Sequence, residues 1–127
     1  MAKSRNRLVA EILSTGIDVT DELVDRFEVT VAGSSNTAID TITDTTVVAV
    51  TYNIVAEKLG SYNYTTVAAV KNSSGSMDYT EYATIQNGDL LSEYSVELSG
   101  GSIVLYADPT TTGVDFQSTR TVVEDNL

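Results

Sequence analysis

Residues 94–107 read YSVELSGGSIVLYA, and this stretch decides the fold. Apolar side chains occupy every second position over Tyr94–Leu98 and again over Ile103–Ala107, with Gly100-Gly101 between the two runs. A period of two is typical of a strand with one buried face, and a glycine pair between two such runs indicates a tight turn. The stretch therefore predicts an antiparallel hairpin that turns one face toward a hydrophobic core.

Similar runs rich in Val, Thr and Tyr recur along the chain at a spacing of about ten residues, which favours a sandwich or barrel. The polar loop 72–76, the Asn87-Gly88 turn signal and the loop 108–113 separate three of them. We predict an antiparallel β-sandwich, jelly-roll or Ig-like, of about seven or eight strands with a short N-terminal helix or arm. The expected strands include residues 27–32, 46–59, 62–70, 77–85, 94–98, 103–107 and 114–122.

The N-terminal segment has a different pattern, which predicts a short helix over residues 4–14. Ser4 is a good N-cap and Gly16 a good terminator, and one face carries an apolar stripe formed by Leu8, Val9, Ile12 and Leu13. A helix of about ten residues is marginal alone in water. We therefore expect it to pack on its own domain or on a partner.

Residues 18–27 fit either a second helical turn or the start of a strand, and the sequence leaves both open. The organisation we expect is a basic anchoring arm and connector over residues 1–33, followed by a sandwich domain over residues 34–127. A chain of 127 residues is an ordinary size for one domain.

Charge is divided unevenly along the chain, whose net charge is −11. Lys3, Arg5 and Arg7 lie among the first ten residues with no acid between them, whereas the remaining residues hold four Lys or Arg against eighteen Asp or Glu. An acidic body repels phosphate backbones, so we expect no nucleic-acid partner. No run approaches the roughly 20 apolar residues of a membrane span, so we expect no membrane partner.

The chain contains no cysteine and no histidine. This excludes disulfides, thiolate metal sites and the commonest general base. Oxygen ligands could still hold calcium, and Asp18, Asp21, Glu22 and Asp25 cluster in the sequence, but they lack the alternating spacing of a calcium loop. We expect no metal and no cofactor.

Paired carboxylates would be the remaining route to catalysis, as in a glycosidase. Glu93 and Glu97 share the polar face of their strand and are expected to be solvated, whereas Glu81 has no evident partner. A lone acid is weak support for catalysis. The sequence therefore favours a protein that is not an enzyme, with a hydrolase based on Glu81 as an alternative.

The chain contains seven tyrosines and no tryptophan. Most are expected to pack in the sandwich with the hydroxyl at its rim. Tyr82 and Tyr106 fall on expected outer faces, where strand tyrosines can bind a glycan or a protein. These two are the candidate ligand-binding residues.

Two parts of the sequence resemble proteins of one class. Residues 1–10, MAKSRNRLVA, are similar to the start of several virion proteins of marine tailed bacteriophages, notably those that infect cyanobacteria. The second half resembles a β module of fibre-like and appendage proteins of such phages, through YTEY at 79–82, YSVELSGG at 94–101, IVL at 103–105 and RT at 120–121. The resemblance covers residues 1–13 and 45–123.

The resemblance implies a virion structural protein, located on the phage particle and docked through its leader to other proteins of the capsid, neck or tail. The docking residues would be Lys3, Arg5, Arg7, Leu8, Val9, Ile12 and Leu13. A homo-oligomer is expected by analogy with fibres and capsid-decorating proteins. The main alternative is a receptor- or glycan-binding module of a phage appendage.

Overall fold

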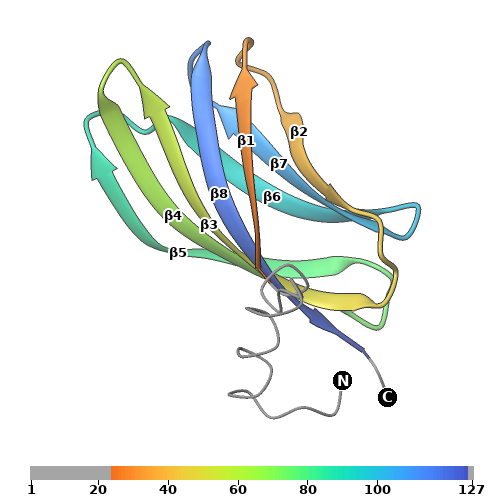
Figure 1. Ribbon diagram of the computed structural model, residues 1–127. Coiled ribbons are helices and arrows are strands. Elements are labelled where there is room, and N and C mark those ends of the chain that lie inside the picture. The colour runs from red at the N-terminus through yellow and green to blue at the C-terminus, as the bar shows by residue number, and fades with distance from the viewer. Residues whose placement is uncertain (1–23, 126–127) are drawn as a thin grey trace, which may run out of the picture.

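The computed structural model describes residues 24–125, which form eight β-strands and no helix (Figure 1). The strands are β1 (Val24–Val31), β2 (Thr37–Ile42), β3 (Val47–Lys58), β4 (Ser61–Lys71), β5 (Met77–Asn87), β6 (Ser92–Ser99), β7 (Ser102–Pro109) and β8 (Val114–Glu124).

Two antiparallel sheets face each other. The larger has the order β1-β8-β3-β4-β5 and the smaller the order β2-β7-β6. The chain crosses from one sheet to the other four times, after β1, β2, β5 and β7, while β3–β4, β4–β5 and β6–β7 are hairpins within a sheet. The expected antiparallel sandwich of about eight strands is thus confirmed.

The core lies between the sheets and follows the alternation of the sequence. Every second residue of β3 from Val50 to Ala56 is buried, as are Phe116 of β8 and Leu105 of β7. The rings of Tyr94 and Phe116 meet edge to face with centroids 6.1 Å apart, which joins the two sheets through an aromatic contact. Burial of these apolar side chains is the main force holding the layers together.

The β6–β7 hairpin has the turn that its glycines predict. Gly100 and Gly101 have φ values of 57° and 87°, and the strands close on each other from the Ser99–Ser102 pair outward. Two consecutive positive φ values are the geometry of a two-residue hairpin turn, which glycine adopts without steric cost.

The connection at Asn87-Gly88 has a different role from a hairpin turn. Gly88 does have a positive φ, but the chain then crosses to the smaller sheet and begins β6. Asn63 of β4 holds this crossing. Its Oδ1 accepts a hydrogen bond from the Leu91 amide at 2.7 Å, and its Nδ2 donates to the Asp89 carbonyl at 3.2 Å.

The five-stranded sheet includes a strand, β1, that precedes residue 34, where we expected the sandwich domain to begin. Strand β1 pairs with β8 over its full length, from Val24 opposite Thr121 to Val31 opposite Val114. Residues 24–27 are therefore strand, which decides that part of the ambiguous segment 18–27. The expected helix 4–14 lies outside the described residues.

Candidate functional site

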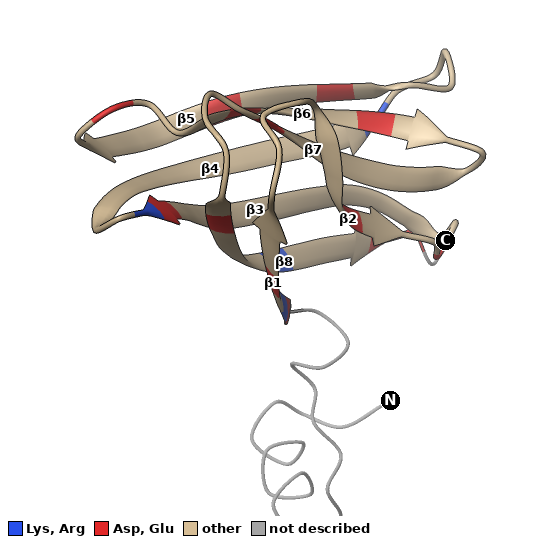
Figure 2. Cartoon of the chain, turned by 90° about the horizontal axis from the view of Figure 1, so that it is seen from above, with Lys and Arg blue, Asp and Glu red and all other residues tan. Residues whose placement is uncertain are grey.

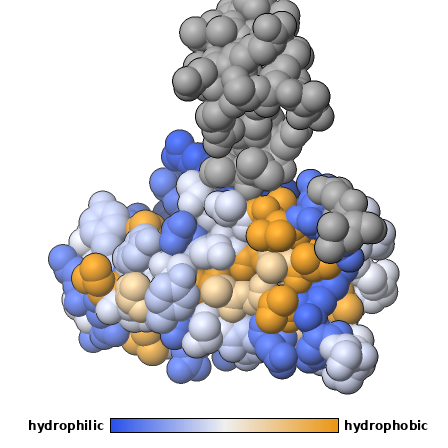
Figure 3. Space-filling model, turned by 90° about the horizontal axis from the view of Figure 1, so that it is seen from below, coloured by the Kyte–Doolittle hydropathy of each residue, from blue (hydrophilic) through white to orange (hydrophobic). Residues whose placement is uncertain are grey.

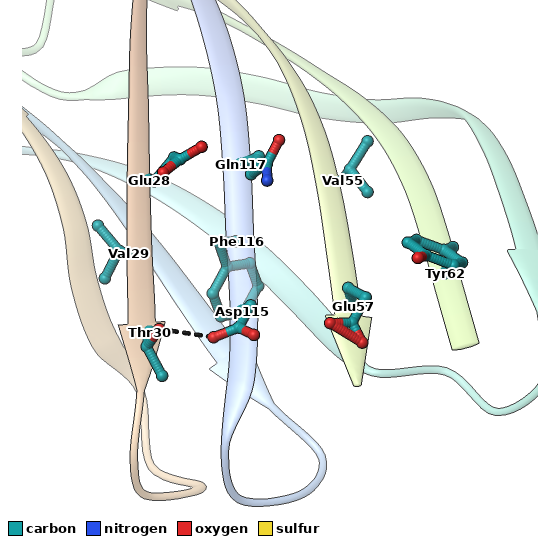
Figure 4. A pocket seen from close by; sticks show the side chains of 9 residues that line it. All are labelled: Glu28, Val29, Thr30, Val55, Glu57, Tyr62, Asp115, Phe116 and Gln117. Carbon is teal, nitrogen blue, oxygen red and sulfur yellow. Dashed lines mark hydrogen bonds between the residues drawn. The ribbon is translucent and has the colours of Figure 1, made fainter. Parts of the chain in front are cut away.

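One hollow of the sandwich lies on the outer face of the five-stranded sheet, near the end where β3 turns into β4. Its volume is about 580 Å³. Figure 4 shows that its side chains come from four strands, β1, β8, β3 and β4. The lining residues are Glu28, Val29, Thr30, Val55, Glu57, Tyr62, Asp115, Phe116 and Gln117.

Strand register brings the outward-facing residues of this hollow into two rows across the sheet. Thr30 lies opposite Asp115, Asp115 opposite Glu57, and Glu57 opposite Tyr62. The next row runs Glu28, Gln117 and Val55 before it reaches Tyr64. Cross-strand neighbours have Cβ atoms about 5 Å apart, so each row forms a continuous surface.

Three carboxylates dominate the polar character of the hollow. Asp115 accepts a hydrogen bond from Thr30 Oγ1 at 2.5 Å, and Glu57 accepts one from the Gly60 amide at 3.2 Å. Glu28 forms an exposed ion pair with Arg26. Within residues 24–125, no Lys or Arg pairs with Glu57 or Asp115.

The hollow also has an aromatic and apolar side. Tyr62 retains 52% of its exposure at one border, and Val55 contributes an aliphatic surface between the carboxylates. Together the groups could accept hydrogen bonds from ligand hydroxyls and stack a sugar or similar ring against Tyr62.

The two tyrosines singled out in the sequence lie on opposite sides of the sandwich. Tyr82, opposite Thr66 of β4, is on the outer face of the five-stranded sheet and is half-exposed. Tyr106, opposite Ser95 of β6, alternates with the buried Leu105 and so lies on the outer face of the smaller sheet. One small ligand cannot contact both rings.

The seven predicted docking residues, Lys3, Arg5, Arg7, Leu8, Val9, Ile12 and Leu13, lie outside the described residues. The same holds for Asp18, Asp21 and Glu22 of the weighed calcium cluster, while its fourth member, Asp25, pairs with Arg120 at 3.0 Å. Among the described residues, no group of three or more acids is arranged to hold a metal ion.

Glu81 projects from β5 on the side that faces the smaller sheet. Partial burial raises the pKa of its carboxyl, the charge of Glu93 raises it further, and a hydrogen bond from the Tyr94 backbone lowers it. Glu93 and Glu97 are exposed on β6. The negative charge of Glu93 therefore acts on the Glu81 carboxyl, and the two residues come from β5 and β6, which are edge strands of the two sheets.

Sequence reasoning missed an ion-pair network that joins the two sheets. Arg120 Nη1 of β8 donates to both carboxylate oxygens of Asp40 in β2 at 2.7 Å, and its Nη2 donates to Asp25 of β1 at 3.0 Å. Beside it, the Tyr52 hydroxyl is buried near Asp40, and burial together with the charge of Asp40 raises its pKa. The signal was present, since Arg120 occupies an inward position of the alternating β8 pattern that also buries Phe116.

The chain matches no protein family and no curated protein. In the part of the chain that the structure describes, no helix is long and apolar enough to cross a membrane.

Proposed function

We propose that the chain is a non-enzymatic structural protein of a bacteriophage virion, docked to the particle through its N-terminal segment and displaying the sandwich. The proposal rests on one observation: the positive charge is concentrated at the N-terminus, whereas the folded sandwich is acidic. Residues 24–125 form a sandwich with its own core and hold fourteen acids against four bases (Figure 2), whereas the first ten residues are cationic.

The entry point of the chain supports an anchoring role for the segment. Strand β1 is an edge strand, paired only with β8, and Val24 is its first residue. A segment attached to the end of an edge strand can bind a partner without any strand of the core being displaced. A cationic segment with an apolar stripe has both the charge and the contact surface that docking on an acidic protein requires.

The absence of catalysis belongs to the same proposal. The sequence offers neither histidine nor cysteine, which removes the commonest general base and the usual thiol nucleophile. A polymer-degrading activity that is lost in Glu81→Gln, or in Glu57→Gln and Asp115→Asn, would contradict the non-enzymatic assignment.

Deletion of residues 1–13 tests the docking role directly. We expect the truncated protein to keep the far-ultraviolet circular dichroism and the cooperative unfolding of a β-sandwich but to be lost from purified particles. Replacing Lys3, Arg5 and Arg7 by Gln should lower incorporation at least tenfold, whereas the matched control Arg26→Gln, on the exposed surface of β1, should leave it unchanged. Normal incorporation of the truncated form would contradict the proposal.

A second candidate function, glycan binding, is favoured by one observation. The hollow on the five-stranded sheet combines the exposed ring of Tyr62 with hydrogen-bonding side chains on three neighbouring strands. Tyr62→Ala should abolish binding in a glycan screen if this hollow is the site. Loss of binding in Tyr82→Ala or Tyr106→Ala alone would instead place the ligand on one of those tyrosines.

A further inference from the structure

The outer face of the five-stranded sheet changes character from one end to the other. Beyond the acidic hollow, the next row is polar and contains Arg26, Thr119, Asn53 and Thr66, and the rows at the far end consist mainly of Thr, Ala and Val. The last two rows contain Thr121, Thr51, Ala68 and Thr80, followed by Val123, Ala49, Val70 and Asp78. We call these eight residues the outer-face patch.

The outer-face patch is exposed and carries one charge. Val123 and Val70 retain 58% and 48% of their exposure, and each is the next-to-last residue of its strand, β8 and β4. A shallow hollow of about 440 Å³ lies over the patch and is lined mainly by apolar atoms. Figure 3 shows apolar residues gathered on this end of the molecule. An unpartnered apolar surface on a folded domain usually marks a contact site.

The chain itself indicates what covers the patch. Val24 pairs with Thr121, so strand β1 starts in the first of the two patch rows. The segment that precedes Val24 is therefore attached at the border of the patch. It contains an apolar stripe, Leu8, Val9, Ile12 and Leu13, which the sequence places on one face of a helix that is too short to be stable alone.

The dimensions of the two surfaces agree. An eleven-residue helix over residues 4–14 would be about 16 Å long at about 1.5 Å per residue. The four strands from β8 to β5 span about 14 Å at about 4.8 Å per strand spacing. The nine residues 15–23 can extend over about 30 Å, which is enough to lay the helix across all four strands.

We propose that the apolar stripe of residues 8–13 packs on the outer-face patch of its own chain in the free protein. Contact would remove Val70 and Val123 from water and give the marginal helix the packing that it needs. The single charge of the patch, Asp78, is acidic and the segment is cationic, so their charges attract. This inference goes beyond the virion assignment and does not depend on it.

The absence of native cysteine makes disulfide trapping a clean test. We expect the full-length variant Ile12→Cys with Val70→Cys to form an intramolecular disulfide under mild oxidation at least tenfold faster than Ile12→Cys with Tyr106→Cys. Tyr106 is a matched control because it lies on the outer face of the other sheet. Equal rates for the two pairs would overturn the proposal, and a disulfide-linked dimer would assign the patch to a second copy instead.

A second measurement keeps the proposal testable without a disulfide. Deletion of residues 1–13 should increase the binding of a hydrophobic dye, because it uncovers the outer-face patch. Adding Val70→Asp with Val123→Asp to the deletion should abolish that increase, whereas adding Ile85→Asp, on the same face but outside the patch, should leave most of it in place. Unchanged dye binding after the deletion, or an increase that persists with the patch substitutions, would show that the segment does not cover the patch.

Discussion

Asn63 shows how one polar side chain can hold a connection between sheets. It is 3% exposed, and its amide group serves both the Leu91 amide and the Asp89 carbonyl of the β5–β6 crossing. The backbone of this crossing has few strand partners of its own. A buried amide that satisfies two backbone groups therefore replaces a stretch of β-ladder.

Asn63→Leu should lower the free energy of unfolding by about 2–4 kcal/mol, because it removes two hydrogen bonds and leaves the buried Leu91 amide without an acceptor. Urea unfolding measures the loss. Asn87→Leu, at an exposed position of β5, is the control and should change stability by less than about 0.5 kcal/mol. Equal small effects at the two positions would mean that Asn63 does not hold the crossing.

Glu81 gives the molecule a pH-dependent weakness. Its folded-state pKa is raised by burial, so the folded protein binds more protons than the unfolded chain as pH rises from the ordinary glutamate range through the raised value. Stability is therefore lost over that interval. Glu81→Gln should be more stable than the parent at pH 7, by less than about 1 kcal/mol because water screens the group, and equal to it at pH 3. A gain that persists at pH 3 would rule out ionisation as the cause.

At the scale of elements, the Arg120 network is the main polar contact between the sheets. The side chains of Arg120 and Asp40 are 21% and 10% exposed, so most of their hydration is lost and each depends on the other. A β-bulge between Ala38 and Asp40 directs both Ile39 and Asp40 of β2 toward the interior. The bulge thereby combines a core contact and an ion pair in a short edge strand.

Arg120→Met should lower the free energy of unfolding by about 2–4 kcal/mol, because Asp40 would be left without its cation. The loss should be smaller than for a fully buried pair, since both side chains keep some contact with water. A double-mutant cycle with Asp40→Asn, followed by chemical unfolding, should give a coupling energy of about 1–3 kcal/mol. Additive single effects would show that the two sheets are held without this pair.

The strands differ in how far the sequence could predict them. Strict alternation and a glycine pair fix β6 and β7, since both signals are local. Strand β2 has only six residues, TAIDTI, and its bulge breaks the period of two. In β5, Ala83 has a φ of 54° and the register shifts beside it, so Ile85 shares the outer face with Tyr82 rather than the inner face with Glu81. A bulge of this kind is not visible in the sequence.

The whole molecule places its two candidate surfaces on one face, which local patterns could not predict. The acidic hollow combines residues of β1 and β8 with residues of β3 and β4, and the pairing of β1 with β8 joins segments about ninety positions apart in the chain. The contrast between the cationic N-terminal segment and the acidic body could be predicted, because it depends only on amino-acid composition. The sequence could not show that the chain enters the sheet beside an apolar patch.

We propose that residues 3–13 connect the sandwich to the virion. A photo-crosslinking residue in place of Val9 tests it most directly, with adducts mapped in the free protein and in purified particles. We expect adducts within the chain, on β3, β4 or β8, in the free protein, and adducts with a second virion protein in the particle. Adducts confined to the chain itself in the particle, or absence of the protein from particles, would contradict it.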